Sequence, residues 1–125
     1  EQAGITVALI TGRQSRAVTH RAQNLGLAHV HQGVRDKLGV LGSLQKNLGV
    51  SPLETAVVGD DLVDLAMMQR SGLAMAVADA PAEVKDRAHW ITSLGGGQGA
   101  VREVCELILK AQGKWESLLS RYLAP

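Results

Sequence analysis

The sequence predicts an α/β fold: a Rossmann-like, doubly wound parallel sheet in three layers, with the first strand of the sheet missing from this chain. Short apolar runs alternate with helical patterns of about ten residues along the chain. These runs are almost continuously apolar, which is typical of parallel strands covered by helices on both faces. Ligands of such sheets bind at the carboxyl ends of the strands, so the residues that follow each strand are candidates for function.

The expected elements follow from these patterns. Strands are expected at residues 5–10, 27–31, 55–59, 73–78 and 90–92. Helices are expected at residues 15–25, 37–48, 61–71, 81–88, 100–111 and 115–123. Gly26 and Gly49 follow the first two helices, because glycine tolerates the left-handed conformation that ends a helix. Ser51 and Glu54 have the spacing of a capping box, but only one turn fits before the next strand.

The beginning of the chain supports the expectation of a missing strand. Residues 1–4 look like the last turn of a helix closed by Gly4, and a strand follows at once. We therefore expect that an upstream segment is absent from this sequence. On this expectation residues 1–125 are a partial core domain, with C-terminal helices and a glycine-rich tail from about residue 95.

The composition favours a single domain with a small-molecule partner. The chain has 125 residues, 46% of them hydrophobic, and a formal net charge of +1 without a basic stripe, so we expect no nucleic-acid partner. No apolar run approaches the roughly 20 residues of a membrane span, so we expect no membrane partner either. The lone Cys105 excludes an internal disulfide and favours a reducing, cytoplasmic compartment, with its thiol in the core.

The first strand runs directly into Thr11, Gly12 and Arg13. A hydroxyl, a flexible backbone and a guanidinium can bind an anion at the start of the following helix. The alternative is a loop in which Thr11 caps the helix and Arg13 is solvated, and the spacing alone slightly favours that alternative. Lys37 opens the helix after the second strand, where its charge opposes the helix dipole. Such a lysine either serves a ligand such as phosphate or is a solvated surface residue.

Three carboxylates follow the third strand, in the run Gly59-Asp60-Asp61-Leu62-Val63-Asp64. Helix capping explains one or two of them but not all three, and acids held together repel one another unless a cation or a basic group neutralises them. Oxygen ligands suit Mg²⁺, which binds through one or two carboxylates and completes its octahedron with water and phosphate. The run therefore predicts a magnesium site among these three carboxylates.

These three signals, in this order, resemble the second, third and fourth motifs of haloacid dehalogenase-type phosphatases. The stretches at residues 8–27, 58–80 and 95–114 are also similar to the capless subfamily of 3-deoxy-D-manno-octulosonate 8-phosphate phosphatases, so the resemblance covers almost the whole chain. It implies that Thr11 and Gly12 hold the phosphoryl group and that Arg13 and Arg21 contact the substrate. It also implies that Lys37 neutralises phosphate charge.

The resemblance further implies that Asp60 is a catalytic Mg²⁺ ligand and that Asp61 and Asp64 orient the loop and a metal-bound water. The first motif of the family, Asp-x-Asp-Gly, has no match in this sequence. Its first aspartate would attack phosphorus in line and form an aspartyl-phosphate. Without that aspartate we expect this chain not to turn over, and we attribute its absence to the missing segment.

The resemblance also implies a homotetramer in which the glycine-rich tail, here residues 95–102, approaches a neighbouring active site. Related sequences often carry Arg where this one has Gln98, which puts a contact between tail and substrate in doubt. A flexible loop ahead of a helix is the alternative interpretation of these glycines.

Competing hypotheses for function come from different classes. The leading one is a cytoplasmic phosphatase acting on 3-deoxy-D-manno-octulosonate 8-phosphate in lipopolysaccharide precursor synthesis, and a close variant acts on a nine-carbon sialic-type acid phosphate. A non-catalytic phosphatase-like module that serves oligomerisation beside a nucleotidyltransferase is the second class. A receiver domain ranks below both, because its acidic pair lies near the first strand and its Lys lies late. An upstream Asp-x-Asp-Gly would favour the enzyme.

Overall fold

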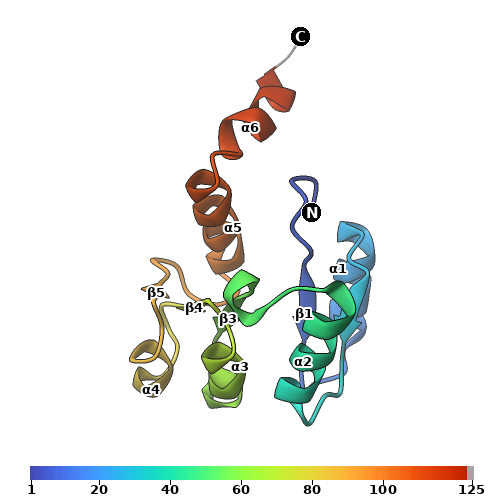
Figure 1. The fold of residues 1–125 in the computed structure, drawn as a ribbon, viewed down its shortest axis with the longest axis vertical. Helices are drawn as coiled ribbons and strands as arrows, with labels where there is room; N and C mark the ends of the chain where they lie inside the picture. Colours follow the sequence, from blue (N-terminus) through green and yellow to red (C-terminus); the bar gives the residue numbers. More distant parts are fainter. Residues whose placement is uncertain (124–125) are drawn as a thin grey trace.

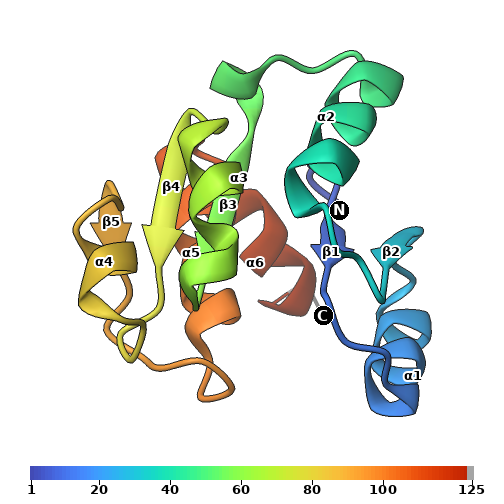
Figure 2. The same cartoon turned by 90° about the horizontal axis from the view of Figure 1, so that it is seen from below.

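The computed structural model describes residues 1–123 and contains two parallel sheets. Strands β1 (Ala8–Ile10) and β2 (His29–His31) form the first sheet. Strands β3 (Ala56–Gly59), β4 (Leu73–Ala76) and β5 (Trp90–Ile91) form the second, in that order. Figure 2 shows both sheets in one row, with their strands running in the same direction. The predicted parallel α/β architecture is therefore confirmed, although each strand is shorter than expected.

Helices lie on both sides of this row of strands, as a three-layer fold requires. Helices α2 (Lys37–Leu48), α3 (Leu65–Gln69) and α4 (Ala82–Lys85) lie on one side, and α5 (Ala100–Ala111) lies on the other (Figure 1). Helix α1 (Arg16–Leu25) connects β1 to β2, and α6 (Trp115–Leu123) continues beyond α5. None of the helices in residues 1–123 is long and apolar enough to span a bilayer.

The sequence predicts one parallel sheet that lacks its first strand, and the strands of the structure are divided between two sheets. In residues 1–123, β1 pairs only with β2, and β3 pairs only with β4. Helix α2 contacts both β1 and α3, so it connects the two halves of the fold. Apolar periodicity predicts which segments become strands, but lateral pairing depends on backbone partners that periodicity does not specify. The facing edges of the two sheets, β1 and β3, are the strands that precede Thr11 and Asp60 (Figure 2).

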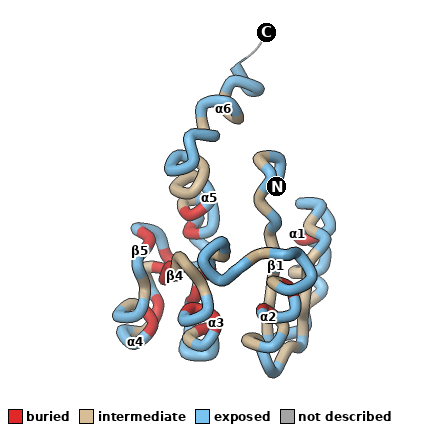
Figure 3. Tube along the Cα trace, in the orientation of Figure 1, coloured by how far each residue is buried: buried red, intermediate tan, exposed pale blue. Residues whose placement is uncertain are grey.

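The core lies mainly between β3, β4 and the helices that cover them (Figure 3). Met67 and Met68 are buried there. The prediction that the Cys105 thiol lies in the core is wrong: on α5 Val104 is buried, whereas Cys105 and Val101 are exposed. Helical spacing predicts a broad apolar stripe along α5. Only part of that stripe is buried, at Ala100 and Val104. Cys105 is therefore not a core thiol.

The helix ends follow the expected rules where the predictions named glycines. Gly26 and Gly49 adopt left-handed conformations, with φ of 72° and 67°, and end α1 and α2. The predicted helix at residues 61–71 is instead a 3₁₀ turn at Leu62–Asp64 followed by the five-residue α3. The acids explain this difference, because Asp61 and Asp64 bind backbone N–H groups at the start of the turn.

Candidate active site

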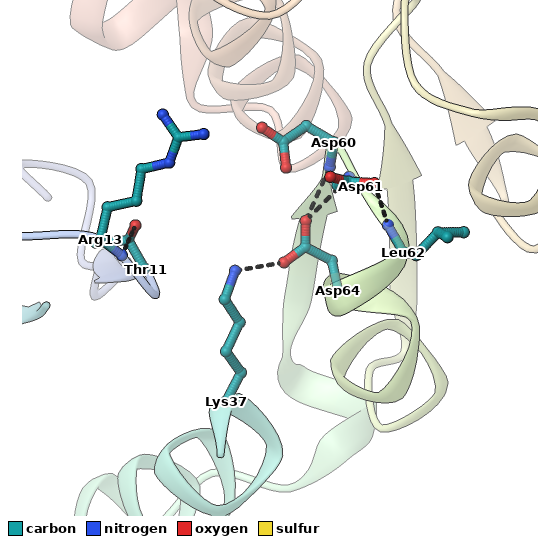
Figure 4. A network of polar contacts seen from close by, with 7 residues as sticks. All are labelled: Thr11, Arg13, Lys37, Asp60, Asp61, Leu62 and Asp64. Carbon is teal, nitrogen blue, oxygen red and sulfur yellow. Dashed lines mark hydrogen bonds and ion pairs between the residues drawn. The ribbon is translucent and has the colours of Figure 1, made fainter. Parts of the chain in front are cut away.

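Asp64 is the centre of the candidate site, and both of its carboxylate oxygens are used. The residue is only 4% exposed. Its Oδ1 accepts a hydrogen bond of 2.8 Å from Lys37 Nζ, which is also an ion pair. Its Oδ2 accepts from the backbone N–H groups of Asp60, at 3.0 Å, and Asp61, at 3.3 Å (Figure 4). Asp64 thus anchors the loop after β3 and positions Lys37 beside that loop.

The local sequence makes this close packing possible. Gly59 ends β3 and is buried, and a Cβ atom there would lie only 2.7 Å from Met68 Sδ. The glycine therefore lets α3 approach the strand. Asp61 then caps the 3₁₀ turn through a 2.7 Å bond from the Leu62 N–H to its Oδ1. Its carboxylate lies on the other side of the loop from that of Asp60 (Figure 4).

The three acids consequently have three different roles instead of forming one cluster. Among residues 1–123 no group of three or more His, Cys, Asp or Glu side chains could hold a metal ion. Asp64 accepts a hydrogen bond from the loop backbone, and Asp61 caps the 3₁₀ turn. Asp60 is exposed, and its carboxylate points into the space between Thr11, Arg13 and Lys37 (Figure 4). The charge of Asp64 nevertheless raises the pKa of Asp60, and the basic group Lys37 pairs with Asp64 at 2.8 Å.

The electrostatics of Asp60 and Asp64 are opposite in sign. The pKa of Asp60 is raised above 3.8, first by its contact with the Asp64 carboxyl group, then by burial and by the Asp64 charge. Burial alone would raise the pKa of Asp64 too, but hydrogen bonds from Lys37 and from the Asp60 backbone outweigh it and lower that pKa. The charged form of Asp64 is therefore favoured in the folded chain, whereas the charged form of Asp60 is disfavoured. A bound cation would favour the charged form of Asp60.

The carboxylate of Asp60 suits Mg²⁺ better than a metal that requires several protein side chains as ligands. Asp60 offers one exposed carboxylate, while its backbone N–H donates to Asp64 Oδ2 at 3.0 Å (Figure 4). Mg²⁺ is commonly held by one or two carboxylates, while water and substrate phosphate fill the other positions. The residues present therefore fit a magnesium ion bound at Asp60.

Thr11 begins the loop that follows β1, on the other side of Lys37 from the acids (Figure 4). The Thr11 backbone is paired with the loop after β2: its N–H donates to the His31 carbonyl at 2.9 Å, and its carbonyl accepts from the Val34 N–H at 3.0 Å. Its Oγ1 accepts from the Arg13 N–H at 3.2 Å, which leaves the hydroxyl hydrogen to donate. The alternative in which Thr11 caps the helix is wrong, because Ser15 is the N-cap of α1.

Two predicted residues lie apart from this group. Arg21 is exposed on α1, and no hydrogen bond or ion pair in residues 1–123 joins it to the other candidates. Gln98 is exposed in the glycine-rich loop, where its N–H donates to the Gly95 carbonyl at 3.1 Å. That loop is anchored to Asp79, because the Gly96 N–H donates to Asp79 Oδ1 at 2.8 Å. The roles of Arg21 and Gln98 stay predictions.

Two polar residues at strand ends were not singled out from the sequence. Asp79 follows β4 and binds the glycine-rich loop. Gln32 follows β2 directly, and its side chain binds the start of α1. The rule that ligands bind beyond the carboxyl ends of strands applies to both positions and could have identified them.

Comparisons with known proteins identify the family of the chain. The sequence model of the haloacid dehalogenase-like hydrolase family matches residues 29–101. The Escherichia coli K12 3-deoxy-D-manno-octulosonate 8-phosphate phosphatase KdsC is 47% identical over 110 residues, which are 88% of this chain. The chain spans 58% of the length of that relative.

Solved structures show the same similarity in three dimensions. The phosphatase of that name from Moraxella catarrhalis, in complex with magnesium, phosphate and KDO, has a TM-score of 0.93 and 43% identity. That match covers 97% of this chain and 70% of the other. The cobalt-bound Haemophilus influenzae phosphatase has a TM-score of 0.86 and 41% identity, over 90% and 66% of the two chains. The chain belongs to the haloacid dehalogenase-like hydrolase family and is similar to its 3-deoxy-D-manno-octulosonate 8-phosphate phosphatases.

Proposed function

We propose that this chain is part of a magnesium-dependent phosphatase that hydrolyses 3-deoxy-D-manno-octulosonate 8-phosphate, a sugar-acid phosphate. One observation carries the proposal: the fold places Lys37, fixed by Asp64 at 2.8 Å, between the Thr11 loop and Asp60. A hydroxyl, an ammonium and an open carboxylate then surround one space. The relatives that bear this substrate in their names support the choice of substrate.

Each side chain has a task that its contacts suit. The Thr11 hydroxyl and the exposed backbone at Gly12 donate to phosphate oxygens. Lys37 supplies positive charge to the phosphoryl group, and its bond to Asp64 keeps it oriented toward that group. Arg13 is exposed beside the loop and contacts the substrate. Arg21 is exposed on α1 and has the same proposed role.

Asp60 is the residue that holds Mg²⁺, and Asp61 and Asp64 keep its loop in place. When bound, the ion neutralises phosphate charge and orients the phosphoryl group. The nucleophile is an aspartate of an Asp-x-Asp-Gly motif outside the printed sequence. Its carboxylate attacks phosphorus in line, the sugar alkoxide leaves with a proton from the second aspartate, and water hydrolyses the aspartyl-phosphate.

The cellular setting belongs to the same proposal. The product alcohol is a sugar acid that is used in lipopolysaccharide precursor synthesis. The proposed reaction takes place in the cytoplasm. The protein assembles as a homotetramer, and the loop that contains Gln98 approaches a neighbouring site.

The test measures phosphate release by this chain alone and by the chain extended at its N-terminus with a strand segment that carries the Asp-x-Asp-Gly motif. We expect release only from the extended chain, only with Mg²⁺, and fastest with the eight-carbon substrate in a panel of sugar-acid phosphates. The matched control is the same extension with the first aspartate of the motif changed to Asn, which should be inactive.

Other outcomes would point to the alternatives. Preference for a nine-carbon sialic-type acid phosphate would replace the substrate but keep the reaction. Magnesium-independent release would overturn the metal assignment. An extended chain that is folded, oligomeric and inactive on the whole panel would favour the non-catalytic module that partners a nucleotidyltransferase.

A further inference from the structure

Gln32 closes a ring of hydrogen bonds at the base of the candidate phosphate-binding loop. Its Oε1 accepts from the Ser15 N–H at 2.8 Å, and its Nε2 donates to Thr19 Oγ1 at 2.7 Å. Thr19 Oγ1 in turn donates to the Ser15 carbonyl at 3.2 Å. The orientation of the amide is determined by these partners, because an N–H can only donate and therefore requires the oxygen of Gln32.

The backbone that follows Gln32 is paired with the Thr11 loop by two hydrogen bonds. The Gly33 N–H donates to the Arg13 carbonyl at 3.0 Å, and the Val34 N–H donates to the Thr11 carbonyl at 3.0 Å. Gly33 has a φ of 65°, and a Cβ atom there would lie 3.0 Å from Gln14 Nε2. The loop after β2 therefore packs closely against residues 11–14 before it reaches Lys37, the first residue of α2.

We propose that Gln32 is a positioning residue that sets the Thr11 loop and the start of α1 relative to Lys37. The proposal rests on the proposed function, because it assigns Gln32 a role at the same phosphate site. A bidentate amide fixes both the distance and the angle between the end of β2 and α1, and ligand-binding groups must be held to a fraction of an ångström. Gln32 itself contacts no substrate; it acts through Thr11 and the N-terminus of α1.

The neutrality of the amide is part of the argument. A glutamate at this position would keep an acceptor for the Ser15 N–H, but it would lose the donor to Thr19 and add a negative charge beside a site for a dianion. A leucine would lose both hydrogen bonds at similar volume. Gln32→Leu therefore tests positioning, and Gln32→Glu tests charge.

Gln45 provides a matched control. Its Nε2 also makes two hydrogen bonds, to Thr55 Oγ1 at 3.1 Å and to the Arg70 carbonyl at 3.2 Å, and it is half-buried like Gln32. These partners lie away from the Thr11 loop. Gln45→Leu should therefore cost similar stability without changing the phosphate site.

The experiment titrates inorganic phosphate, with Mg²⁺ present, into the wild-type chain and the variants while amide NMR signals and hydrogen exchange are recorded. Gln32→Leu should weaken phosphate binding roughly tenfold, in the range found for groups that orient ligating side chains. It should also speed exchange at Gly33 and Val34. Thr19→Val removes the two hydrogen bonds of Thr19 Oγ1 but keeps the one from the Ser15 N–H to Gln32, so it should fall between Gln32→Leu and wild type.

The outcomes separate this inference from the proposed function. If Gln32→Leu binds phosphate within twofold of wild type, or if Gln45→Leu weakens binding equally, the positioning role is wrong while the site stands. If the wild-type chain itself binds no phosphate, both the proposed function and the positioning role of Gln32 are wrong. In the extended, active chain Gln32→Leu should raise KM for the substrate, whereas Gln45→Leu should leave both KM and kcat unchanged.

Discussion

Asp64→Ala is expected to lower the free energy of unfolding by about 3–5 kcal/mol, the range for removing one partner of a buried ion pair. The pair qualifies because the side chains of Lys37 and Asp64 are only 15% and 6% exposed. The alanine would leave the Lys37 ammonium half-buried without its partner. It would also leave the N–H groups of Asp60 and Asp61 without their acceptor. Urea denaturation at neutral pH measures the loss.

Asp61→Ala is the matched control, because it removes a carboxylate from the same loop. Asp61 is exposed and only caps the 3₁₀ turn, so its loss should cost about 1 kcal/mol. Lys37→Met is a second variant for the case in which Asp64→Ala fails to fold, since it keeps the backbone bonds to Asp64. Equal losses for Asp64→Ala and Asp61→Ala would show that the ion pair does not hold the two halves of the fold together.

The same pair should make stability depend on pH in a defined direction. The pKa of Asp64 is lower in the folded chain than its ordinary value of about 3.9, so its contribution is fully present above that value. The contribution is lost as the pH falls through the lowered pKa of the folded state. Wild type and Asp64→Ala should therefore differ most at neutral pH and converge under strongly acidic conditions. Denaturation at a series of pH values would contradict this if the difference stayed constant.

The positions of the main site residues could be predicted because they depend on one simple rule. Apolar runs identify strands, parallel strands place their carboxyl ends at one edge, and Thr11, Lys37 and Asp60 all follow such ends. The prediction needed only the order of strands and helices along the chain. The confirmed glycine helix ends depend on local backbone conformation in the same way.

What could not be predicted depends on the directions of side chains. Asp60, Asp61 and Asp64 are close in sequence, but a 3₁₀ turn sends their carboxylates in three directions. The pairing of Asp64 with Lys37 joins residues 27 positions apart, and no periodic pattern indicates such a contact. Gln32 was missed because a lone glutamine has no motif, and its role is visible only from its partners.

The largest functional effect is expected from Asp60→Asn, which should abolish the effect of Mg²⁺ on phosphate binding. The substitution keeps the size of the side chain but removes the charge that the proposed site offers to the cation. Changes to groups that merely orient a metal ligand cost roughly 10–100-fold in affinity, so loss of the ligand itself should weaken Mg²⁺ binding by at least about 100-fold. Calorimetric titration of the chain with Mg²⁺ in the presence of phosphate measures this.

Asp60→Asn should leave stability unchanged or improve it, and this combination is what separates a ligand from a structural acid. The pKa of Asp60 is raised because its charge is disfavoured by Asp64 and by burial, so an amide relieves that penalty. Asp79→Asn is the matched control, since it keeps an Oδ1 acceptor for the Gly96 N–H and lies after the neighbouring strand. It should leave Mg²⁺ binding intact. A destabilised Asp60→Asn variant that still binds Mg²⁺ like wild type would mean that Asp60 serves the fold, and the metal would then have to be held elsewhere.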